Sequence, residues 1–246
     1  MKLGTKLFAI ASFVVLSACA APDVSGGVFD PYETQNRATH EFNRALDRTL
    51  VRPASKAYGG ILPEPVRNGV SNFANNLSLP GTVVNDILQL NLEDAAHNTV
   101  RFLVNSTIGI GGLWDPALQS GVEARDSDFG ETLHVWGVKE GAYLEVPFVG
   151  PSTTRDTVGI LVDLVIDPLN VLVPTPEVYL APIASVASTV GDRYRFSGTV
   201  DSILHESADS YTQTRLFYLE NRRFELGEEN DQADDELYDL YEEAYE

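Results

Sequence analysis

The chain has 246 residues, with 36 acidic side chains against 17 lysines and arginines, and a formal net charge of −19. That charge excludes nucleic-acid binding as a function, because contacts with phosphates require clustered Lys and Arg. It also argues against attachment to an anionic membrane by charge, so we expect any membrane contact beyond a lipid anchor to be apolar.

The first 18 residues are typical of a bacterial export signal. Lys2 and Lys6 precede an apolar run from 7 to 16, which is too short to cross a bilayer core of ~30 Å. The run ends in Leu-Ser-Ala-Cys at Cys19, the only cysteine of the chain. This pattern resembles the lipobox of bacterial lipoproteins, in which the cysteine is acylated and becomes the first mature residue. We therefore expect a signal peptide over 1–18 and a lipid on Cys19; an ordinary signal with an incidental cysteine is the alternative.

Residues 19–29 contain small and polar residues and are expected to be a lipidated tether. Ala20 follows the cysteine, in the position where an aspartate would resemble an inner-membrane retention signal. The sequence therefore favours the outer membrane, with the protein anchored by lipid on its periplasmic side. Removal of Lys2 and Lys6 with the signal would take the net charge to 15 − 36 = −21.

From residue 30 onwards the hydrophobic pattern is mainly helical. Asp30, Pro31 and Glu33 have the spacing of a capping box that begins an amphipathic helix, which we expect to end before Pro53.

Three more helices are expected before residue 108. One runs from 63 to about 77, a short one runs from 80 to 90, and the third is capped by Asn91.

A glycine-rich segment follows, with Gly109, Gly111 and Gly112. It does not match a dinucleotide fingerprint, because Trp114 stands where the third glycine belongs, and no Lys-Ser/Thr pair completes a phosphate loop. We expect a flexible apolar turn between helices. Close approach of the backbone to a lipid or a neighbouring chain is the alternative.

One small β-hairpin is expected between residues 131 and 151. Leu133 and Val135 alternate with polar or aromatic neighbours, Gly141 marks a turn, and a second strand is expected from 143 to 148. A hairpin alone is only marginally stable, so it should pack on the helices.

The next helix carries the most informative charges. Thr153 and Asp156 have the spacing of a capping box, and the apolar run from 158 to 173 is interrupted by Asp163. The run is too short and too charged to span a membrane. Asp156 and Asp163 are seven residues apart, so they share one face of a helix.

Charges in such an apolar segment must pair or line a wet cavity, because burial of an unpaired charge is costly. Two interpretations stay open. One is an internal salt bridge with Arg193 or Arg215, and the other is a polar strip, together with Arg155, along an apolar channel.

The C-terminal part is helical from about 182 to 226, with a break at Ser197 and Gly198. Eleven acidic residues follow Arg223 without a basic one. We expect residues 227–246 to be an acidic tail that is disordered or partly helical, with docking on a basic partner as the alternative.

No motif for catalysis or metal binding is present. The four histidines, at 40, 97, 134 and 205, lie in separate segments without metal-ligand spacing, and no GxSxG nucleophile motif occurs. The sequence therefore predicts a protein that is not an enzyme and that needs neither a cofactor nor a metal.

Many short motifs together resemble the MlaA/VacJ family over roughly residues 28–226. They include DPYETQNR at 30–37, PVRNGVSNF at 65–73, NSTIG at 105–109, DFG at 128–130 and GPS-TRD across 150–156. The acidic tail lies outside this resemblance.

The resemblance implies a mainly α, single compact ring-like (doughnut) domain over 30–226, built of amphipathic helices with one small β-hairpin. It implies an outer-membrane phospholipid-binding lipoprotein, embedded in the inner leaflet, whose amphipathic channel removes mislocalised phospholipid and so maintains lipid asymmetry. The partners it implies are phospholipid, a trimeric porin and a soluble periplasmic carrier. A structural lipoprotein that braces porins, or a tethered hydrolase, is the alternative function.

The same resemblance suggests which residues line the channel. The acidic cluster of the family maps onto Asp156 and Asp163, whereas two further acidic positions of some relatives are Thr157 and Ile160 here. The candidate channel-lining or lipid-binding residues are Arg155, Asp156, Asp163 and Arg193, and the candidate flexible loop of the channel region contains Gly109, Gly111 and Gly112.

Overall fold

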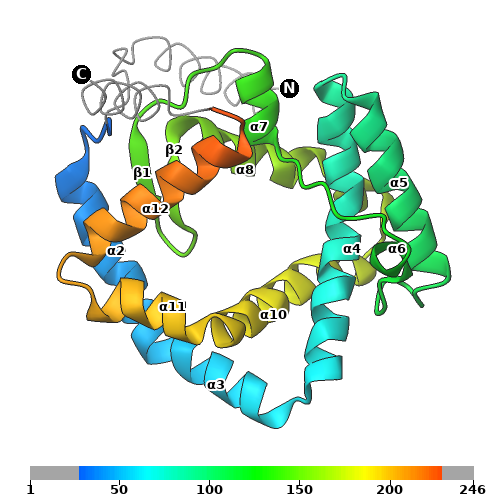
Figure 1. Ribbon diagram of the computed structural model, residues 1–246, viewed down its shortest axis with the longest axis horizontal. Helices are drawn as coiled ribbons and strands as arrows, with labels where there is room; N and C mark the ends of the chain where they lie inside the picture. Colours follow the sequence, from blue (N-terminus) through cyan, green and yellow to red (C-terminus); the bar gives the residue numbers. More distant parts are fainter. Residues whose placement is uncertain (1–27, 229–246) are drawn as a thin grey trace, which may run out of the picture.

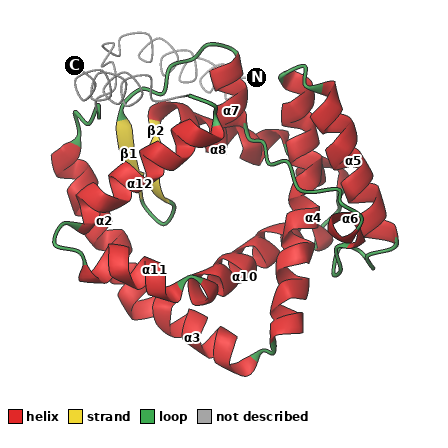
Figure 2. Ribbon diagram, in the orientation of Figure 1, coloured by secondary structure: helices red, strands yellow, loops and turns green. Residues whose placement is uncertain are grey.

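The computed structural model describes residues 28–228, which form a ring of helices around an open centre (Figures 1 and 2). The predicted fold class, mainly α with one small hairpin, is confirmed. The expected signal peptide, Cys19 and the acidic tail from residue 229 onwards lie outside the described residues.

The elements follow one another around the ring, with helices in red and strands in yellow in Figure 2. The first half contains α2 (Glu33–Leu46), the π-helical turn η1 (Asp47–Val51), α3 (Arg52–Ile61), α4 (Glu64–Leu88), α5 (Leu92–Thr107), α6 (Pro116–Gln119) and α7 (Phe129–Val135). The second half contains β1 (Tyr143–Val146), β2 (Gly150–Thr153), α8 (Thr154–Ile166), α9 (Pro168–Leu172), η2 (Glu177–Tyr179), α10 (Leu180–Arg195), α11 (Ser197–Asp201), η3 (Ser202–Glu206) and α12 (Ser210–Glu225).

The first helix differs from the prediction at both ends. It begins at Glu33 with no side-chain cap, because Asp30 instead accepts hydrogen bonds from Asn36 (2.9 Å) and Arg215 (2.6 Å). It also does not end before Pro53. The chain stays helical through η1 into α3, and Pro53 is the second residue of α3.

The predicted pair of helices at 63–77 and 80–90 is a single helix, α4, with Pro80 inside it. Proline removes one helical hydrogen bond, but the turns on both sides remain helical because α4 packs against α5 and α10. The predicted cap of the next helix is confirmed, since the Asn91 side chain accepts from the backbone N–H of Asp94.

The hairpin exists, but its first strand was predicted in the wrong place. Residues 129–135 form α7, because the Asp128 side chain caps the helix by accepting from the N–H of Glu131. The two antiparallel strands are β1 and β2, with Tyr143 opposite Thr153 and Val146 opposite Gly150. The apolar residues Leu133 and Val135 alternate with other residues over too short a stretch to distinguish a strand from a helix. The N-cap at Asp128 favours the helix.

The ring closes where the N-terminal α2 meets β1 and the start of α12. His40 of α2 is buried and contacts Glu145 of β1 (3.3 Å) and Ser210 of α12 (2.9 Å). Tyr143 donates to the same glutamate at 2.6 Å. A cluster of Tyr143, Tyr211 and Leu219 forms the adjoining hydrophobic core. Contacts between residues more than 100 positions apart therefore hold the two ends of the domain together.

Candidate functional site

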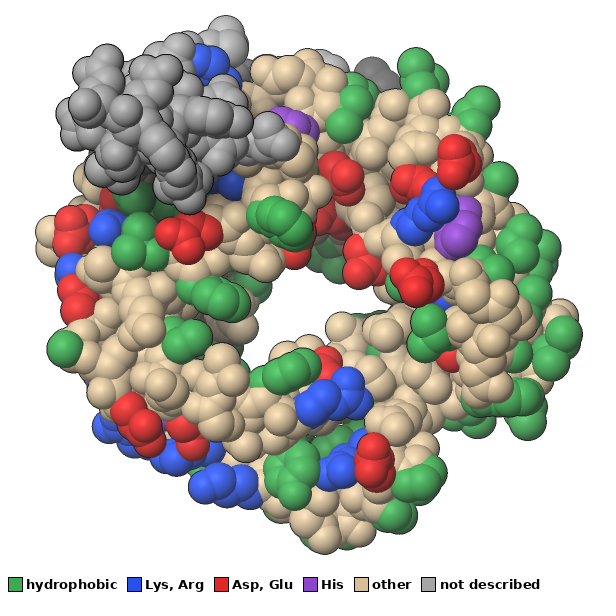
Figure 3. Space-filling model, in the orientation of Figure 1, with side chains coloured by type: hydrophobic (Ala, Val, Ile, Leu, Met, Phe, Trp, Pro, Cys, Tyr) green, Lys and Arg blue, Asp and Glu red, His purple; other side chains and the backbone are tan. Residues whose placement is uncertain are grey.

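An opening passes through the middle of the ring in the space-filling view (Figure 3). Acidic side chains gather on its rim near α7 and α8, and a smaller group of acidic and basic side chains lies at its lower edge near α10. Hydrophobic and other side chains border the remainder. The side near α7 and α8 contains Asp156 and Asp163, two of the charged residues singled out in the sequence.

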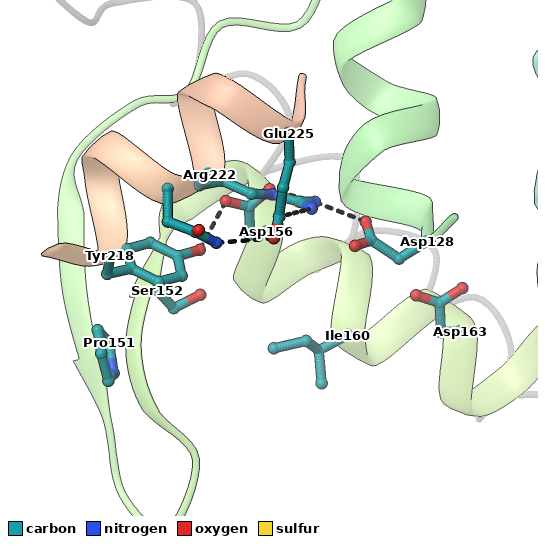
Figure 4. Close-up of a pocket in the computed structure, with 10 residues that line it drawn as sticks. Asp128, Pro151, Ser152, Asp156, Ile160, Asp163, Tyr218, Arg222 and Glu225 are labelled. Atoms are coloured by element: carbon teal, nitrogen blue, oxygen red, sulfur yellow. Dashed lines mark hydrogen bonds and ion pairs between the residues drawn. The ribbon is translucent and has the colours of Figure 1, made fainter. Parts of the chain in front are cut away.

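A cavity of about 290 Å³ lies along this polar side, between α8, β2 and α12 (Figure 4). It is lined by Asp128, Pro151, Ser152, Asp156, Ile160, Asp163, Tyr218, Asn221, Arg222 and Glu225. The predicted N-cap of α8 is present, because the Thr153 side chain accepts a hydrogen bond from the backbone N–H of Asp156. Helix α8 therefore begins directly after β2, and both elements line the cavity. We call this cavity the acidic pocket.

Asp156 forms the best-connected part of the acidic pocket. Its carboxylate lies 3.3 Å from both Arg155 and Arg222 and accepts hydrogen bonds from Tyr218 and Thr153, each at 2.8 Å. Burial alone would raise the pKa of Asp156, but the two guanidinium groups and these hydrogen bonds outweigh burial and hold the pKa below its ordinary value. Asp156 is therefore a paired, ionised structural charge.

Asp163 has different surroundings. It accepts hydrogen bonds from Asn85 (2.8 Å) and from the backbone N–H of Phe129 (3.0 Å), which are neutral donors. Burial raises the pKa of Asp163, and these hydrogen bonds only partly offset it. Among the described residues, no guanidinium lies within ion-pair distance of Asp163, so its charge is not neutralised by one.

Arg155 is buried behind the acidic pocket rather than in its lining. Besides Asp156, its guanidinium lies 3.5 Å from Glu228 and 3.4 Å from a ring nitrogen of His134. Its Nη2 atom has no hydrogen-bond partner among the described residues. The side chain orients Asp156 and links α8 to the end of α12.

Helix α12 contributes residues to the acidic pocket that no sequence motif predicted. Tyr218, Arg222 and Glu225 are spaced four and three residues apart, so they share one face of the helix and point toward α8 (Figure 4). Arg222 contacts Asp128 (2.7 Å) and Asp156 (3.3 Å). The sequence shows that the three residues share a helix face, but it does not show that Arg222 contacts Asp128 and Asp156, which are distant in the chain.

Arg193 does not belong to the acidic pocket. It lies on α10 and contacts Asp47 (2.8 Å) and Asp201 (2.5 Å). Asp47, Asp201 and His205 have ligand atoms within 4.8 Å of one another, as a metal site would require. The guanidinium of Arg193 already bridges the two carboxylates, so the group is a buried ion-pair cluster. Arg215, the other suggested partner of Asp156, contacts Asp30 instead.

The glycine turn lies at the end of α5, on the side of α4 that faces away from the opening (Figure 1). Gly112 has φ +94° and a Cβ there would lie 2.5 Å from the Asn76 Cβ. A Cβ on Gly109 would clash with the Trp114 carbonyl oxygen. Both glycines thus permit close approach of the backbone to neighbouring parts of the same chain.

The outer surface of the ring is rich in exposed apolar side chains, which gather over α5 and α6 in Figure 3. The exposed apolar residues in and between these two helices are Val100, Leu103, Ile108, Ile110, Leu113, Trp114 and Leu118. Further exposed apolar residues on α8 to α10 are Leu161, Leu164, Val165, Leu172, Leu180, Ile183 and Val186. Large exposed apolar surfaces mark contacts with membranes or proteins. Within residues 28–228, none of the helices has the length and hydrophobicity of a membrane span.

Comparison with known proteins finds relatives that align with most of this chain. An uncharacterised protein of Rickettsia prowazekii is 36% identical over 189 residues, which are 76% of this chain and 74% of the relative. The intermembrane phospholipid transport system lipoprotein MlaA of Shigella flexneri is 30% identical over 228 residues, and so is that of Escherichia coli; each alignment covers 91% of this chain and 89% of the relative.

A solved structure, described as the structural basis for maintenance of bacterial outer membrane lipid asymmetry, superposes with a TM-score of 0.69. It is 29% identical, and the match covers 80% of this chain and 98% of that one. The family model of the MlaA lipoprotein matches residues 28–225, which is nearly the whole described region. The chain therefore belongs to the MlaA lipoprotein family.

Proposed function

We propose that this chain is an outer-membrane lipoprotein that removes mislocalised phospholipid from the outer leaflet through the opening of its ring. It passes the lipid to a soluble periplasmic carrier and so maintains the lipid asymmetry of the outer membrane. Family membership supports this function, as do relatives named as phospholipid transport lipoproteins and a related structure concerned with outer-membrane lipid asymmetry.

One observation carries the proposal: acidic side chains gather on one side of the opening, and hydrophobic side chains also border it. A phospholipid has a charged headgroup and apolar chains, and a uniformly apolar passage would require full desolvation of the headgroup, which is costly. Asp163 and the neighbouring polar groups of the acidic pocket offer hydrogen bonds and charge to a headgroup in transit.

The exposed apolar side chains support a position of the ring in the inner leaflet of the outer membrane, on the periplasmic side. Acyl chains on Cys19 hold it there, since each buried CH₂ contributes ~0.8 kcal/mol. Transfer of an intact lipid changes no covalent bond, so the ring needs no catalytic residue. Direction comes from its partners, which we propose are a trimeric porin and the carrier.

Native mass spectrometry of the gently extracted protein tests this function, and we expect bound phospholipid. A strain without the protein should show more phospholipid at the cell surface. Asp163→Leu should lower lipid transfer more than it lowers stability.

The alternatives predict different outcomes. Stoichiometric conversion of phospholipid to lysolipid would support the hydrolase. No rise in surface phospholipid on deletion would support a protein that only braces porins.

A further inference from the structure

Four basic side chains are spaced by four residues along α2, η1 and α3: Arg44, Arg48, Arg52 and Lys56. Residues four apart lie on the same side of a helix, and the chain stays helical through these three elements. Figure 3 shows Lys and Arg side chains gathered along the outer edge of the ring over this region. We call the four residues the basic stripe.

The basic stripe contrasts with the rest of the molecule. The described residues 28–228 carry 15 basic and 26 acidic side chains, a net charge of 15 − 26 = −11. Residues 42–63 carry the four bases and a single acid, Asp47, whose carboxylate is buried against Arg193 and His205. The only acid of this segment therefore does not neutralise the stripe.

Two members of the stripe lack an intramolecular counter-ion. Arg44 contacts Glu41 at 3.1 Å, and Arg52 contacts Asp201 at 2.5 Å. Arg48 and Lys56 are exposed, and no carboxylate of the described residues lies within ion-pair distance of either. Their charges face outward without compensation, so they are available to an external anion.

Exposed apolar residues flank the stripe. Leu50 is 61% exposed and Ile61 is 77% exposed, and Phe42 lies at its start. Basic side chains beside exposed apolar ones are typical of helices that lie in the interface of a membrane, where the apolar groups enter the acyl region and the bases reach phosphates. The evenly spaced positive charges of the basic stripe match a surface with many similar phosphate groups. We therefore favour a headgroup layer over a single binding site on a protein.

We propose that the basic stripe binds the phosphate groups of an anionic phospholipid headgroup layer, such as one containing phosphatidylglycerol. The inference rests on the membrane attachment in the proposed function, and it adds which side of the ring meets the headgroups. It departs from the expectation, drawn from net charge, that membrane contact beyond the lipid anchor is apolar. Net charge averages over the molecule, whereas folding concentrates four bases on one edge.

The chain provides its own control for a test. After removal of Lys2 and Lys6, its lysines are Lys56 in the stripe and Lys139 in the exposed turn before β1. Acylated full-length protein is reconstituted into vesicles with or without phosphatidylglycerol, and the rate of reductive methylation of each lysine is read by peptide mass spectrometry.

Near an anionic surface at ~0.01 M salt, where the screening length is about 30 Å, we expect methylation of Lys56 to slow about fivefold. The rate should recover at ~0.5 M salt, while Lys139 stays unchanged. Arg48→Gln should weaken the protection of Lys56, whereas Arg125→Gln, which removes an equal charge from a base paired with Glu93 and Asp94, should not.

Three outcomes would overturn the inference. Equal rates for Lys56 with and without phosphatidylglycerol would exclude headgroup binding. Protection by soluble glycerol phosphate at matched ionic strength would indicate a site for a free phosphate. Protection that appears only with an added acidic protein would assign the stripe to a protein partner. Bound phospholipid in native mass spectra is measured separately, so failure of the stripe leaves the proposed transport function standing.

Discussion

Asp156 and Asp163 lie two turns apart on one face of α8, yet their surroundings give their carboxylates opposite behaviour. The pKa of Asp156 is lowered, so its contribution to stability is fully present above the ordinary aspartate pKa of ~3.9 and is lost as pH falls through the lower native value. The pKa of Asp163 is raised, so its ionisation reduces stability as pH rises from ~3.9 through the native value.

These signs predict different effects of two matched substitutions. Asp156→Asn should lower the free energy of unfolding by about 3 kcal/mol at pH 7, because it removes the buried carboxylate that Arg155 and Arg222 share. Asp163→Asn should change it by less than about 1 kcal/mol, since it removes one hydrogen bond and also a charge that burial disfavours. Urea unfolding at pH 7 and pH 3 checks both, and the deficit of Asp156→Asn should shrink at pH 3. Equal losses at pH 7 would contradict the distinction.

Among the elements, α12 connects most of the acidic pocket. Its Arg222 reaches Asp128 at the start of α7 and Asp156 in α8, and the neighbouring Arg223 points instead to Glu140 before β1. The pocket therefore depends on how α12 docks against α7 and α8, and less on the local structure of α8 alone.

Arg222→Gln should consequently destabilise the protein by about 3 kcal/mol, because it removes the cation shared by two carboxylates. Arg223→Gln is the control on the same helix and should cost about 1 kcal/mol or less, since the Arg223 side chain is more exposed than that of Arg222 and contacts Glu140 instead of the buried Asp156. Chemical denaturation of both variants, with native mass spectrometry of bound lipid, measures the difference. If Arg223→Gln proves as costly as Arg222→Gln, α12 is held by general packing and not by this cluster.

At the scale of the whole molecule, a ring has little thick interior, and many of its buried groups are polar. Asn36, Asn85, Asn98 and Asn105 are almost fully buried, and each hydrogen-bonds to another element or to a carboxylate. Such contacts are directional, so they hold the helices in one arrangement around the opening without filling it.

The attachment of the whole molecule is predicted from Cys19, which lies outside the described residues. Cys19→Ala should abolish acylation, because no other thiol is available, and the protein should accumulate as a precursor or leave the membrane fraction. Membrane fractionation and the intact mass of the protein measure both effects. Ser17→Ala is the control: it keeps a small residue two positions before Cys19, so the protein should remain acylated. Normal retention of Cys19→Ala in the outer membrane would contradict the lipid anchor.

Local sequence was sufficient for several features. The caps at Asn91 and Thr153, the helical character of most of the chain and the shared face of Asp156 and Asp163 all depend on residues within one or two turns. The two wrong predictions of secondary structure also came from short stretches of sequence. Pro80 appeared to end a helix and a short alternation around Leu133 appeared to be a strand, because packing and a cap outweighed weak propensities.

The sequence by itself determined the charge, the lipobox at Cys19, the amphipathic helices and the family resemblance. Only the tertiary structure decided which charges meet. Arg222 reaches Asp156 across 66 positions, and Arg193 reaches Asp47 across 146. Closure of the ring brings these distant residues together. No pattern within a few neighbouring residues predicts that closure. Likewise, a net charge of −19 is a sum over the chain, whereas the basic stripe is a property of how helices orient their faces.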